Sequence, residues 1–376
     1  MDCAVVPSCL VRPERPDYPY CLWHSNKMNN LTGTKLAKLQ EQLDQERRLV
    51  SFDSYDLTVA SLMEMIVSGA VFVPPEYQRQ FIWEPKRQST LIESIFLGIP
   101  IPTIFMATNT DATWEVVDGV QRLGSMCHFI GSKDLLKNID LAEPLKISGL
   151  EKLSMLNEAS YAQLPKSMQL HFQTRFLKIV VLNDKSDLSV RFDLFERLNT
   201  GGVLLTEQEI RNCVYRGPFN DSLKELATSA DLRKVVLLGE KAPGGAYEDI
   251  VLRFFAYLNN YQNFDHIVKS FLNDYMDKSK SSPLAKAQVD LFNKTFAILA
   301  AALPDGVVRG RAKSPVNLAE AIAVGTALSL KAGQIPDNKK IKALLEDEKL
   351  KKYTGAGSNQ KKFVVSRIEY VRDSVA

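Results

Sequence analysis

The sequence predicts an α+β protein in which a small mixed sheet with helices is followed by a mostly α-helical C-terminal region. Short runs of β-branched and other apolar residues have the composition of strands at 71–73, 103–107, 114–117 and 176–182. From Asp221 onward, apolar residues recur at helical spacing almost without interruption. Because 376 residues exceed the usual size of a single core, we expect several parts. They are an N-terminal extension at 1–50, a sheet-bearing domain at 51–216 and a helical domain at 217–376.

The composition is that of an ordinary globular protein. Hydrophobic residues make up 45% and charged residues 24%, and the formal net charge is +3, which fits neither a histone-like cation nor an acidic tail. Nucleic-acid binding must therefore rest on a local patch. No apolar run approaches the roughly 20 residues of a membrane span, and the N-terminus has no signal-peptide pattern. We expect a cytoplasmic protein without a membrane partner.

The cysteines and histidines give no strong metal or disulfide pattern. The five cysteines are an odd number, and Cys127 and Cys213 lie inside apolar helical patterns, which argues for a reducing compartment. A zinc site from Cys3, Cys9, Cys21 and His24 lacks the close ligand pairs at both ends that zinc ribbons and fingers use. The four histidines form no H-E-x-x-H pattern. We predict no metal and no cofactor, and a metal-dependent hydrolase is disfavoured.

Apolar spacing and end signals place the individual elements. We expect helices at Lys35–Arg48, Leu57–Ile66, Gln88–Leu97, Asp187–Leu198, Asp249–Leu258, Leu291–Leu303, Asn317–Leu330 and Lys339–Leu350. The strands at 103–107 and 114–117 flank an Asn-Thr-Asp turn, so we expect them to pair as a hairpin. At Thr206, the Glu209 side chain three residues later predicts a capping box, which makes Glu209 a cap rather than a catalyst.

The stretch from Trp114 to Arg122 has the most compact chemical pattern in the chain. Its strand ends at Asp118, Gly119 permits a tight turn, and helical spacing resumes immediately afterwards. Asp118 therefore lies beside free helix N–H groups, and Gln121 and Arg122 project from the first turn. Two interpretations follow: Asp118 caps the helix, or the acid, the amide and the cation form the beginning of a site.

Two further stretches have compositions that suit nucleic-acid contact. In the first, the aromatic residues Tyr77, Phe81 and Trp83 alternate with Gln78 and Arg79, as in proteins that stack on a base and hold a phosphate. The alternative is a core loop whose aromatic side chains pack inward. The second is a glycine-bearing basic segment from Tyr353 onward that contains Lys361, Lys362 and Arg367. It could bind a phosphate backbone or be a solvated surface loop.

The helix at 187–198 carries Arg197 on its polar side and ends at a glycine-rich turn. That turn, from Asn199 to Gly202, exposes backbone N–H groups that could hold an anion. Arg211 follows in the next predicted helix. We group these residues with the basic segment as candidate contacts to the DNA backbone.

Six separated motifs resemble a known family. They are Pro75–Arg79, Phe81–Trp83, Leu91–Ser94, Gly98–Pro102, Val117–Arg122 and Phe195–Gly202. In this order they are similar to the DGQQR-box domain, the N-terminal half of the GmrSD modification-dependent restriction enzymes, which has a ParB/sulfiredoxin-like fold. The motifs span about residues 57–216, and Tyr247–Phe254 and Thr354–Arg367 look like the helical continuation of the family.

The resemblance implies phage defence and a DNA partner with modified bases, often glucosylated hydroxymethylcytosine. In the two-part members, the DGQQR domain looks like a nucleotide-hydrolysing or DNA-sensing regulator, and a separate HNH-like domain cuts, which implies a separate nuclease subunit as a partner. This sequence departs from the family in two ways. Val120 replaces the first Gln of the box, which puts nucleotide hydrolysis by the usual arrangement in doubt, and the HNH half is missing.

Three hypotheses for function follow. The first is a metal-independent hydrolase of modified phage DNA, with a base-releasing glycosylase favoured over an endonuclease. Asp118 would be a base or electrostatic stabiliser, since the neighbouring Arg122 favours the ionised carboxyl. The aromatic residues would stack on an extruded base, and Gln78 or Gln121 would read its edge. The second hypothesis is a nucleotide-binding or NTP-hydrolysing regulator. The third is a non-catalytic ParB-like DNA-binding module, and the sequence leaves the oligomeric state open.

Overall fold

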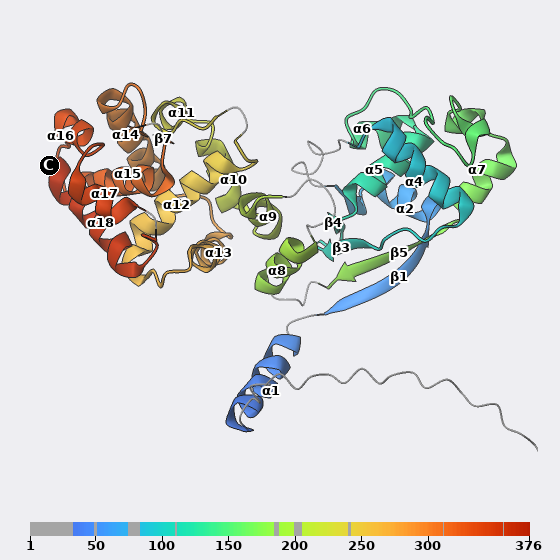
Figure 1. Ribbon diagram of the computed structural model, residues 1–376, viewed down its shortest axis with the longest axis horizontal. Helices are drawn as coiled ribbons and strands as arrows, with labels where there is room; N and C mark the ends of the chain where they lie inside the picture. Colours follow the sequence, from blue (N-terminus) through green and yellow to red (C-terminus); the bar gives the residue numbers. More distant parts are fainter. Residues whose placement is uncertain are drawn as a thin grey trace, which may run out of the picture. The chain divides into compact units, whose positions relative to one another are not determined.

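The computed structural model describes most of the chain (Figure 1). The described residues are 33–48, 51–73, 83–109, 111–183, 188–198, 205–239, 242–310, 312–355 and 357–376. The chain divides into a first unit that ends at Arg48 and a second unit that begins at Leu49. In the first unit, helix α1 spans Gly33–Arg48, which confirms the expected helix. Its leucines 36, 39 and 43 form one apolar stripe and are about half exposed.

The second unit begins with a mixed sheet, as the sequence predicted, and it has five strands where the sequence indicated four. Its strands are β1 Phe52–Thr58, β2 Val71–Phe72, β3 Ile104–Thr108, β4 Trp114–Asp118 and β5 Phe176–Leu182. Their order is β1-β5-β3-β4-β2. Pairs β1/β5 and β3/β4 are antiparallel, whereas β2/β4 and β3/β5 are parallel. The expected hairpin of β3 and β4 is confirmed. Asp118 lies opposite Phe105, next to a bulge in this pairing.

Helices cover the sheet and complete its core. They are α2 Val59–Val67, α4 Pro85–Leu97, α5 Val120–Ile130, α6 Lys133–Asn138, α7 Lys166–Gln173 and α8 Leu188–Leu198, with short 3₁₀ turns at Ser154–Leu156 and Tyr161–Gln163. Figure 1 shows α2, α4 and α5 on one side of the sheet. The strands turn alternate residues toward this core, such as Ile104, Met106, Ile179 and Val181, all of which are buried.

The expected helix from Leu57 begins two residues later than the sequence suggested. Residues 52–58 form the outer strand β1, and Thr58 caps α2 by accepting a hydrogen bond from the Ser61 N–H. Five of the seven β1 residues are exposed, so the segment lacks the alternation of apolar and polar residues that identifies a half-buried strand. The pairing of β1 therefore comes from its contact with β5, a tertiary effect that local composition does not report.

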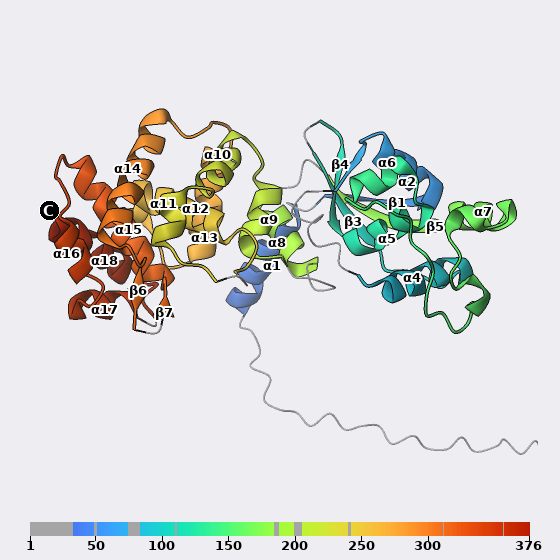
Figure 2. The same ribbon diagram turned by 90° about the horizontal axis from the view of Figure 1, so that it is seen from above.

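The rest of the second unit is helical, as expected. The helices are α9 Glu207–Val214, α10 Pro218–Leu226, α11 Ala230–Val235, α12 Ala246–Asn260, α13 Val268–Ser279, α14 Lys286–Ala302, α15 Val316–Lys331, α16 Asn338–Ala343, α17 Glu348–Thr354 and α18 Lys361–Val375, with a 3₁₀ turn at Tyr261–Asn263. Figure 2 shows α12, α14, α15 and α18 grouped together. Helix α15 is buried along most of its length. It approaches α18 closely at Gly325, where a Cβ atom would lie 2.5 Å from Val371.

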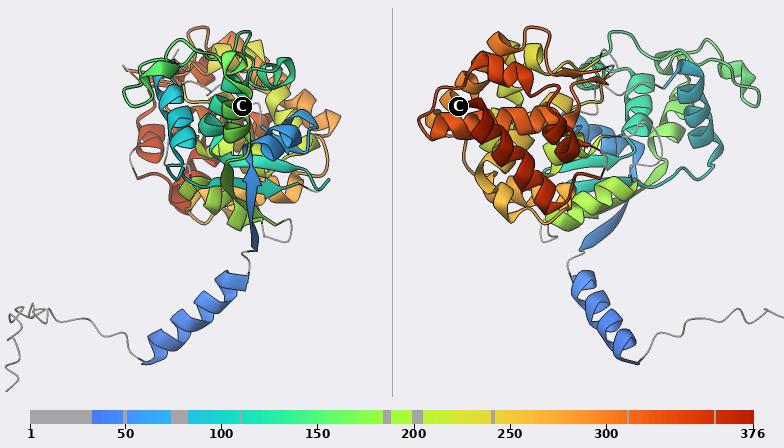
Figure 3. Two further views of the ribbon diagram at one scale, coloured as in Figure 1. Left: turned by 90° about the vertical axis from the view of Figure 1, so that its right-hand side faces the viewer. Right: turned by 60° about the vertical axis from the view of Figure 1, so that its left-hand side comes forward.

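Two details of the helical region differ from expectation. The single helix expected at 339–350 is instead α16 and α17, and the break between them ends at Asp347, whose carboxylate accepts the Leu350 N–H at 2.7 Å and caps α17. A small hairpin of β6 Val308–Arg309 and β7 Ala312–Lys313 lies between α14 and α15, where the sequence analysis placed no strand. Figure 3 shows the orange-to-red helices of this region from two more sides.

Candidate functional site

The turn between β4 and α5 is built around Gly119. This residue has φ +103° and occupies the N-cap position of α5. A Cβ atom there would lie 3.1 Å from Ile104 and 3.3 Å from the Arg122 guanidinium, so a side chain has neither the conformation nor the space. Among the residues that the structure describes, no side chain caps α5. The interpretation of Asp118 as a simple helix cap is therefore wrong.

Asp118 instead pairs with Arg122. The Arg122 Nη2 donates to Asp118 Oδ2 at 2.7 Å, while Nη1 donates to two backbone carbonyls, Pro102 at 2.5 Å and Thr103 at 3.0 Å. Arg122 is buried, but 29% of the Asp118 side chain is exposed. Its second oxygen, Oδ1, accepts no hydrogen bond from any residue that the structure describes. The result is a carboxylate with one oxygen fixed by a cation and the other oxygen available at the surface.

Gln121 ties the first turn of α5 to the segment that precedes α4. Its Oε1 accepts the Trp83 backbone N–H at 3.1 Å. The Trp83 carbonyl in turn accepts from Gln88 Nε2 at 2.7 Å, and the Arg87 guanidinium lies 4.2 Å from the centre of the Trp83 ring. The structure therefore places Trp83 next to the Asp118 turn. Gln121 serves as a structural link between the two segments.

The same hydrogen-bonded chain continues to a half-buried histidine. His128 Nδ1 lies 2.8 Å from Gln88 Oε1, and Nε2 lies 3.0 Å from the Glu143 carbonyl oxygen. Both partners are acceptors, because Gln88 already donates its amide to Trp83. Desolvation lowers the pKa of His128 from its ordinary value, although the Glu143 carbonyl opposes that effect. Burial thus disfavours the imidazolium form, which alone could donate both hydrogen bonds.

Several long-range contacts that the sequence did not reveal hold the surrounding elements. Glu115, a buried acid on β4, pairs with Arg216 at 3.0 Å. Arg191 on α8 donates to the Thr108 carbonyl at 2.6 Å and to the Asn183 carbonyl at 3.2 Å, so α8 is anchored at the ends of β3 and β5. These contacts join residues far apart in sequence, and no local motif marks them.

The residues expected to contact DNA differ in how exposed they are to solvent. Arg197 and the two lysines Lys361 and Lys362 are exposed. Trp83 is partly exposed. The remaining expected contacts lie outside the described residues: Tyr77, Gln78, Arg79, Phe81, Asn199, Gly201 and Gly202.

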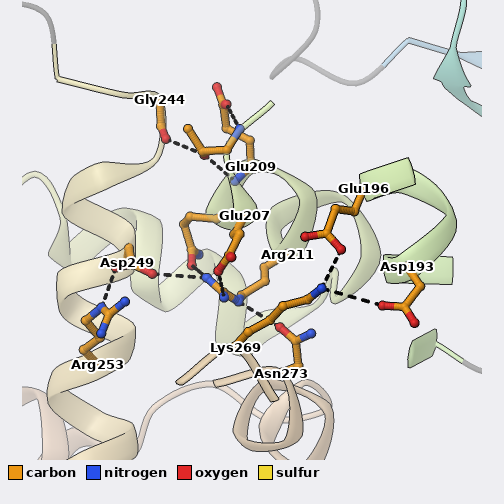
Figure 4. Close-up of polar contacts among 12 residues, drawn as sticks. Asp193, Glu196, Glu207, Glu209, Arg211, Gly244, Asp249, Arg253, Lys269 and Asn273 are labelled. Carbon is orange, nitrogen blue, oxygen red and sulfur yellow. Dashed lines mark hydrogen bonds and ion pairs between the residues drawn. The ribbon is translucent and has the colours of Figure 1, made fainter. Parts of the chain in front are cut away.

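For Arg211 and Arg367, the structure contradicts the expectation of DNA contact. Both side chains are 0% exposed. Figure 4 shows Arg211 between Glu207, at 2.9 Å, and Asp249, at 3.1 Å, with Asn273 accepting from its Nε. Arg367 pairs with Glu320 at 2.5 Å and donates to the Ser358 carbonyl. A fully buried guanidinium cannot touch a DNA phosphate, so both arginines hold the helical region together instead.

The other sequence expectations can be compared with the described part of the chain. The capping box is confirmed, since the Thr206 hydroxyl accepts the Glu209 N–H and Glu209 accepts the Thr206 N–H. Cys127 and Cys213 are buried free thiols. Cys3, Cys9, Cys21 and His24 lie outside the described residues. Among the residues described, no three His, Cys, Asp or Glu side chains are grouped so as to hold a metal ion, and no helix is both long enough and apolar enough to cross a membrane.

These features define a small mixed-sheet domain with an acid–cation pair at a strand-to-helix turn and a helical continuation. Residues 59–216 match the family model described as the GmrSD restriction endonuclease, N-terminal domain. This part of the chain therefore belongs to that family and is a ParB-like DGQQR-type domain of a modification-dependent restriction system. Comparisons with curated proteins and with solved structures found no match.

Proposed function

We propose that this protein acts in cytoplasmic defence against phage by metal-independent hydrolysis at modified nucleotides of DNA, with release of the modified base. The observation that supports the proposal most is that the Asp118 carboxylate is both held in place and partly exposed. One oxygen is held by Arg122, whose own position is set by two backbone carbonyls, and the carboxylate remains partly exposed. A fixed, accessible carboxylate suits the cleavage of a glycosidic bond.

In the proposed reaction, Asp118 accepts a proton from a water molecule as the water oxygen attacks C1′ of the deoxyribose. The bond between C1′ and the base nitrogen breaks, and its electron pair leaves with the base, which then takes a proton from solvent. The negative charge of Asp118 stabilises the oxocarbenium-like transition state. Arg122 and Gln121 are positioning residues, because Arg122 orients the carboxylate and Gln121 holds Trp83.

The modified base would stack on Trp83, together with Tyr77 and Phe81, and Gln78 would read its edge. Arg79, Asn199, Gly201 and Gly202 would hold the neighbouring phosphates. The exposed cations Arg197, Lys361 and Lys362 complete the proposed contacts to DNA. Glucosylated hydroxymethylcytosine is the modification we propose, and a separate nuclease subunit is a proposed partner.

The match to a domain of a restriction endonuclease favours an endonuclease as a second candidate. A third candidate, an NTP-hydrolysing regulator, has less support at the DGQQR-type box. Val120 stands where the family has Gln, and its side chain is buried among Ile66, Val73 and Leu123. Most of the residues around Val120 are apolar, and Asn138 is the one polar side chain among the described residues that line this cavity.

One assay separates these candidates. The full chain is incubated with ordinary DNA and with glucosylated-hydroxymethylcytosine DNA in the presence of EDTA, and the products are analysed before and after alkali. Breaks that appear only after alkali indicate abasic sites and support the proposal. Direct breaks indicate an endonuclease, and phosphate release from GTP or ATP indicates the regulator.

Replacing Asp118 tests the central residue. We expect Asp118→Asn to lower the rate of base release by about 100-fold or more, because the amide can neither accept the proton nor carry the stabilising charge. The matched control, Asp53→Asn, changes an exposed aspartate on β1 of the same domain and should leave the rate within twofold. If Asp118→Asn retains every activity, the assignment of the site is wrong.

A further inference from the structure

A second concave site lies at the end of the sheet where β1 ends and β5 begins. The cavity has a volume of about 510 Å³, within the range of about 300–1,000 Å³ usual for small-molecule sites. Its apolar wall is the connector 98–101 between α4 and β3. Its charged and imidazole side chains come from three places: His171 and Arg175 from the end of α7, Lys178 from β5, and Asp56 from β1.

This pocket opens at the same end of the strands as Asp118. Strands β3 and β5 are parallel, and Ile104 lies opposite Ile179, so both strands start at this end of the sheet. Asp118 ends β4 opposite Phe105. The connector that forms the pocket wall continues into Pro102 and Thr103, whose carbonyls bind Arg122. The pocket and the Asp118 turn are therefore neighbouring sites that share one connector.

Arg175 is the fixed cation of the pocket. Its Nη2 donates to the Phe96 carbonyl at 3.2 Å and lies 2.7 Å from His171 Nε2. No carboxylate in the described parts of the chain pairs with Arg175, and its Nε is buried without a hydrogen-bond partner there. The Nη1 group lies next to Gly98 in the pocket wall and donates to no residue that the structure describes, so it is the donor left for a ligand.

Gly98 keeps this guanidinium uncovered. The residue has φ +71°, and a Cβ atom there would lie 3.3 Å from Arg175 Nη1. A side chain would therefore press on the guanidinium that forms this part of the pocket wall. Glycine at this position serves both the left-handed end of α4 and the opening of the pocket.

Lys178 supplies a second cation that is available at small cost. Its ammonium lies 3.4 Å from Asp56, and the two side chains are 51% and 61% exposed. An exposed ion pair of this kind contributes little to stability, so Lys178 can turn toward a bound anion. With Arg175 and Lys178 against the single carboxylate of Asp56, the pocket favours an anionic ligand.

From these contacts we infer that the pocket binds a phosphate group. Arginine with unused N–H donors matches the oxygen arrangement of a phosphate, and lysine adds a movable charge. The phosphate can belong to the DNA backbone or to a free nucleotide, and both sources share this chemistry. The inference rests on the proposed function only in taking DNA as one of the two sources.

The experiment measures binding of two probes to the full chain. A fluorescein-labelled DNA duplex is followed by fluorescence anisotropy, and GTP is followed by calorimetry. We expect the double variant Arg175→Gln, Lys178→Gln to bind one of the probes at least about tenfold more weakly, as expected for lost charged hydrogen bonds. The matched control, Lys137→Gln, removes an exposed lysine of the same domain that does not line the pocket and should change neither affinity by more than twofold.

The two sources are separated by which probe loses affinity. Loss of DNA affinity, with a salt dependence shallower by about one phosphate contact per cation removed, identifies the backbone. Loss of GTP affinity with unchanged DNA affinity identifies a nucleotide. If the wild-type chain binds neither probe, or if the double variant binds both as the control does, the inference is wrong.

Two further variants protect the test against a folding defect. Lys178→Glu changes only a half-exposed side chain and should weaken binding more than Lys178→Gln, because it reverses the charge. Arg175→Lys keeps the charge and should restore part of the affinity. Base release measured on the same proteins tells the two proposals apart. If neither the wild-type protein nor any variant releases base, while the double variant still loses probe affinity, the proposed function fails and the pocket assignment stands.

Discussion

At the scale of single residues, the site depends on a few side chains that each have two or three partners. Arg122 joins a carboxylate to two backbone carbonyls, and Gln88 joins Trp83 to His128. A side chain held at both ends loses little further freedom when a ligand arrives, which favours a preorganised site. The polar network around Asp118 thus fixes the carboxylate before substrate binds.

His128 should make stability depend on pH. Burial lowers its pKa in the folded protein, so the unfolded chain binds the proton more tightly. Its contribution to stability is present above the ordinary histidine pKa of 6.5 and is lost as the pH falls from that value through the lower pKa of the folded protein. We expect the free energy of unfolding, measured with urea between pH 7.5 and 5.5, to fall more steeply in the wild type than in His128→Gln. Equal slopes would contradict this account.

At the scale of elements, the strand-turn-helix around Asp118 could be predicted because its signals are local. The hairpin, the glycine turn and the start of α5 all follow from residues within about 20 positions of one another. The interpretation of Asp118 could not be decided locally, because the partners that hold Arg122 are at Pro102 and Thr103. Likewise, β1 was not predicted, since its pairing partner β5 lies more than a hundred residues away.

The contact between α15 and α18 should be sensitive to one added side chain. Gly325 lies against Val371, and a Cβ atom would approach it to 2.5 Å. We expect Gly325→Val to lower the free energy of unfolding by about 1–3 kcal/mol or more, because the helices must separate. Gly239→Ala is the control, since a Cβ atom there meets nothing within 4 Å. Urea unfolding followed by circular dichroism measures both, and equal midpoints would show that the contact adapts without cost.

At the scale of the whole second unit, buried charges join segments that the sequence separates. Arg211 on α9 binds Asp249 on α12 and Asn273 on α13, and Lys269 on α13 reaches Glu196 on α8 at 2.5 Å (Figure 4). The helices that flank residues 199–204 are thus both held by the helical region. The division between domains at residue 216 stays a proposal. The polar contacts of α9 are made with the helical region on the other side of that division.

Removing Arg211 tests that connection. We expect Arg211→Ala to lower the free energy of unfolding by about 2–3 kcal/mol, because its charged hydrogen bonds to Glu207 and Asn273 are lost. Asp249 keeps its ion pair with Arg253. The control, Arg372→Ala, removes an exposed arginine paired with Asp373 and should cost no more than about 1 kcal/mol. Thermal and urea unfolding measure the difference. Similar costs for the two variants would mean that the buried network adds no more than a surface pair.

How much of the site the sequence reveals depends on where the partners lie. The motif residues Asp118 and Arg122 are four positions apart, so their pairing follows from helical spacing. Arg211 and Arg367 look like surface cations in sequence, and only the carboxylates brought by other helices explain their burial. The pocket at Arg175 contains one motif segment, Gly98–Pro102, but its cations come from the end of α7 and from β5, so the sequence does not show that they meet.

The outer strand β1 has a consequence for how the protein behaves in concentrated solution. Among the described strands it pairs only with β5, and its other edge carries unpaired backbone groups next to Phe52, which is 60% exposed. Such an edge can add strands from another copy and start aggregation. Asp53 and Asp56 oppose this, because two copies aligned edge to edge would bring carboxylates together. Colloidal stability should therefore decline when these carboxylates are neutralised or screened by salt.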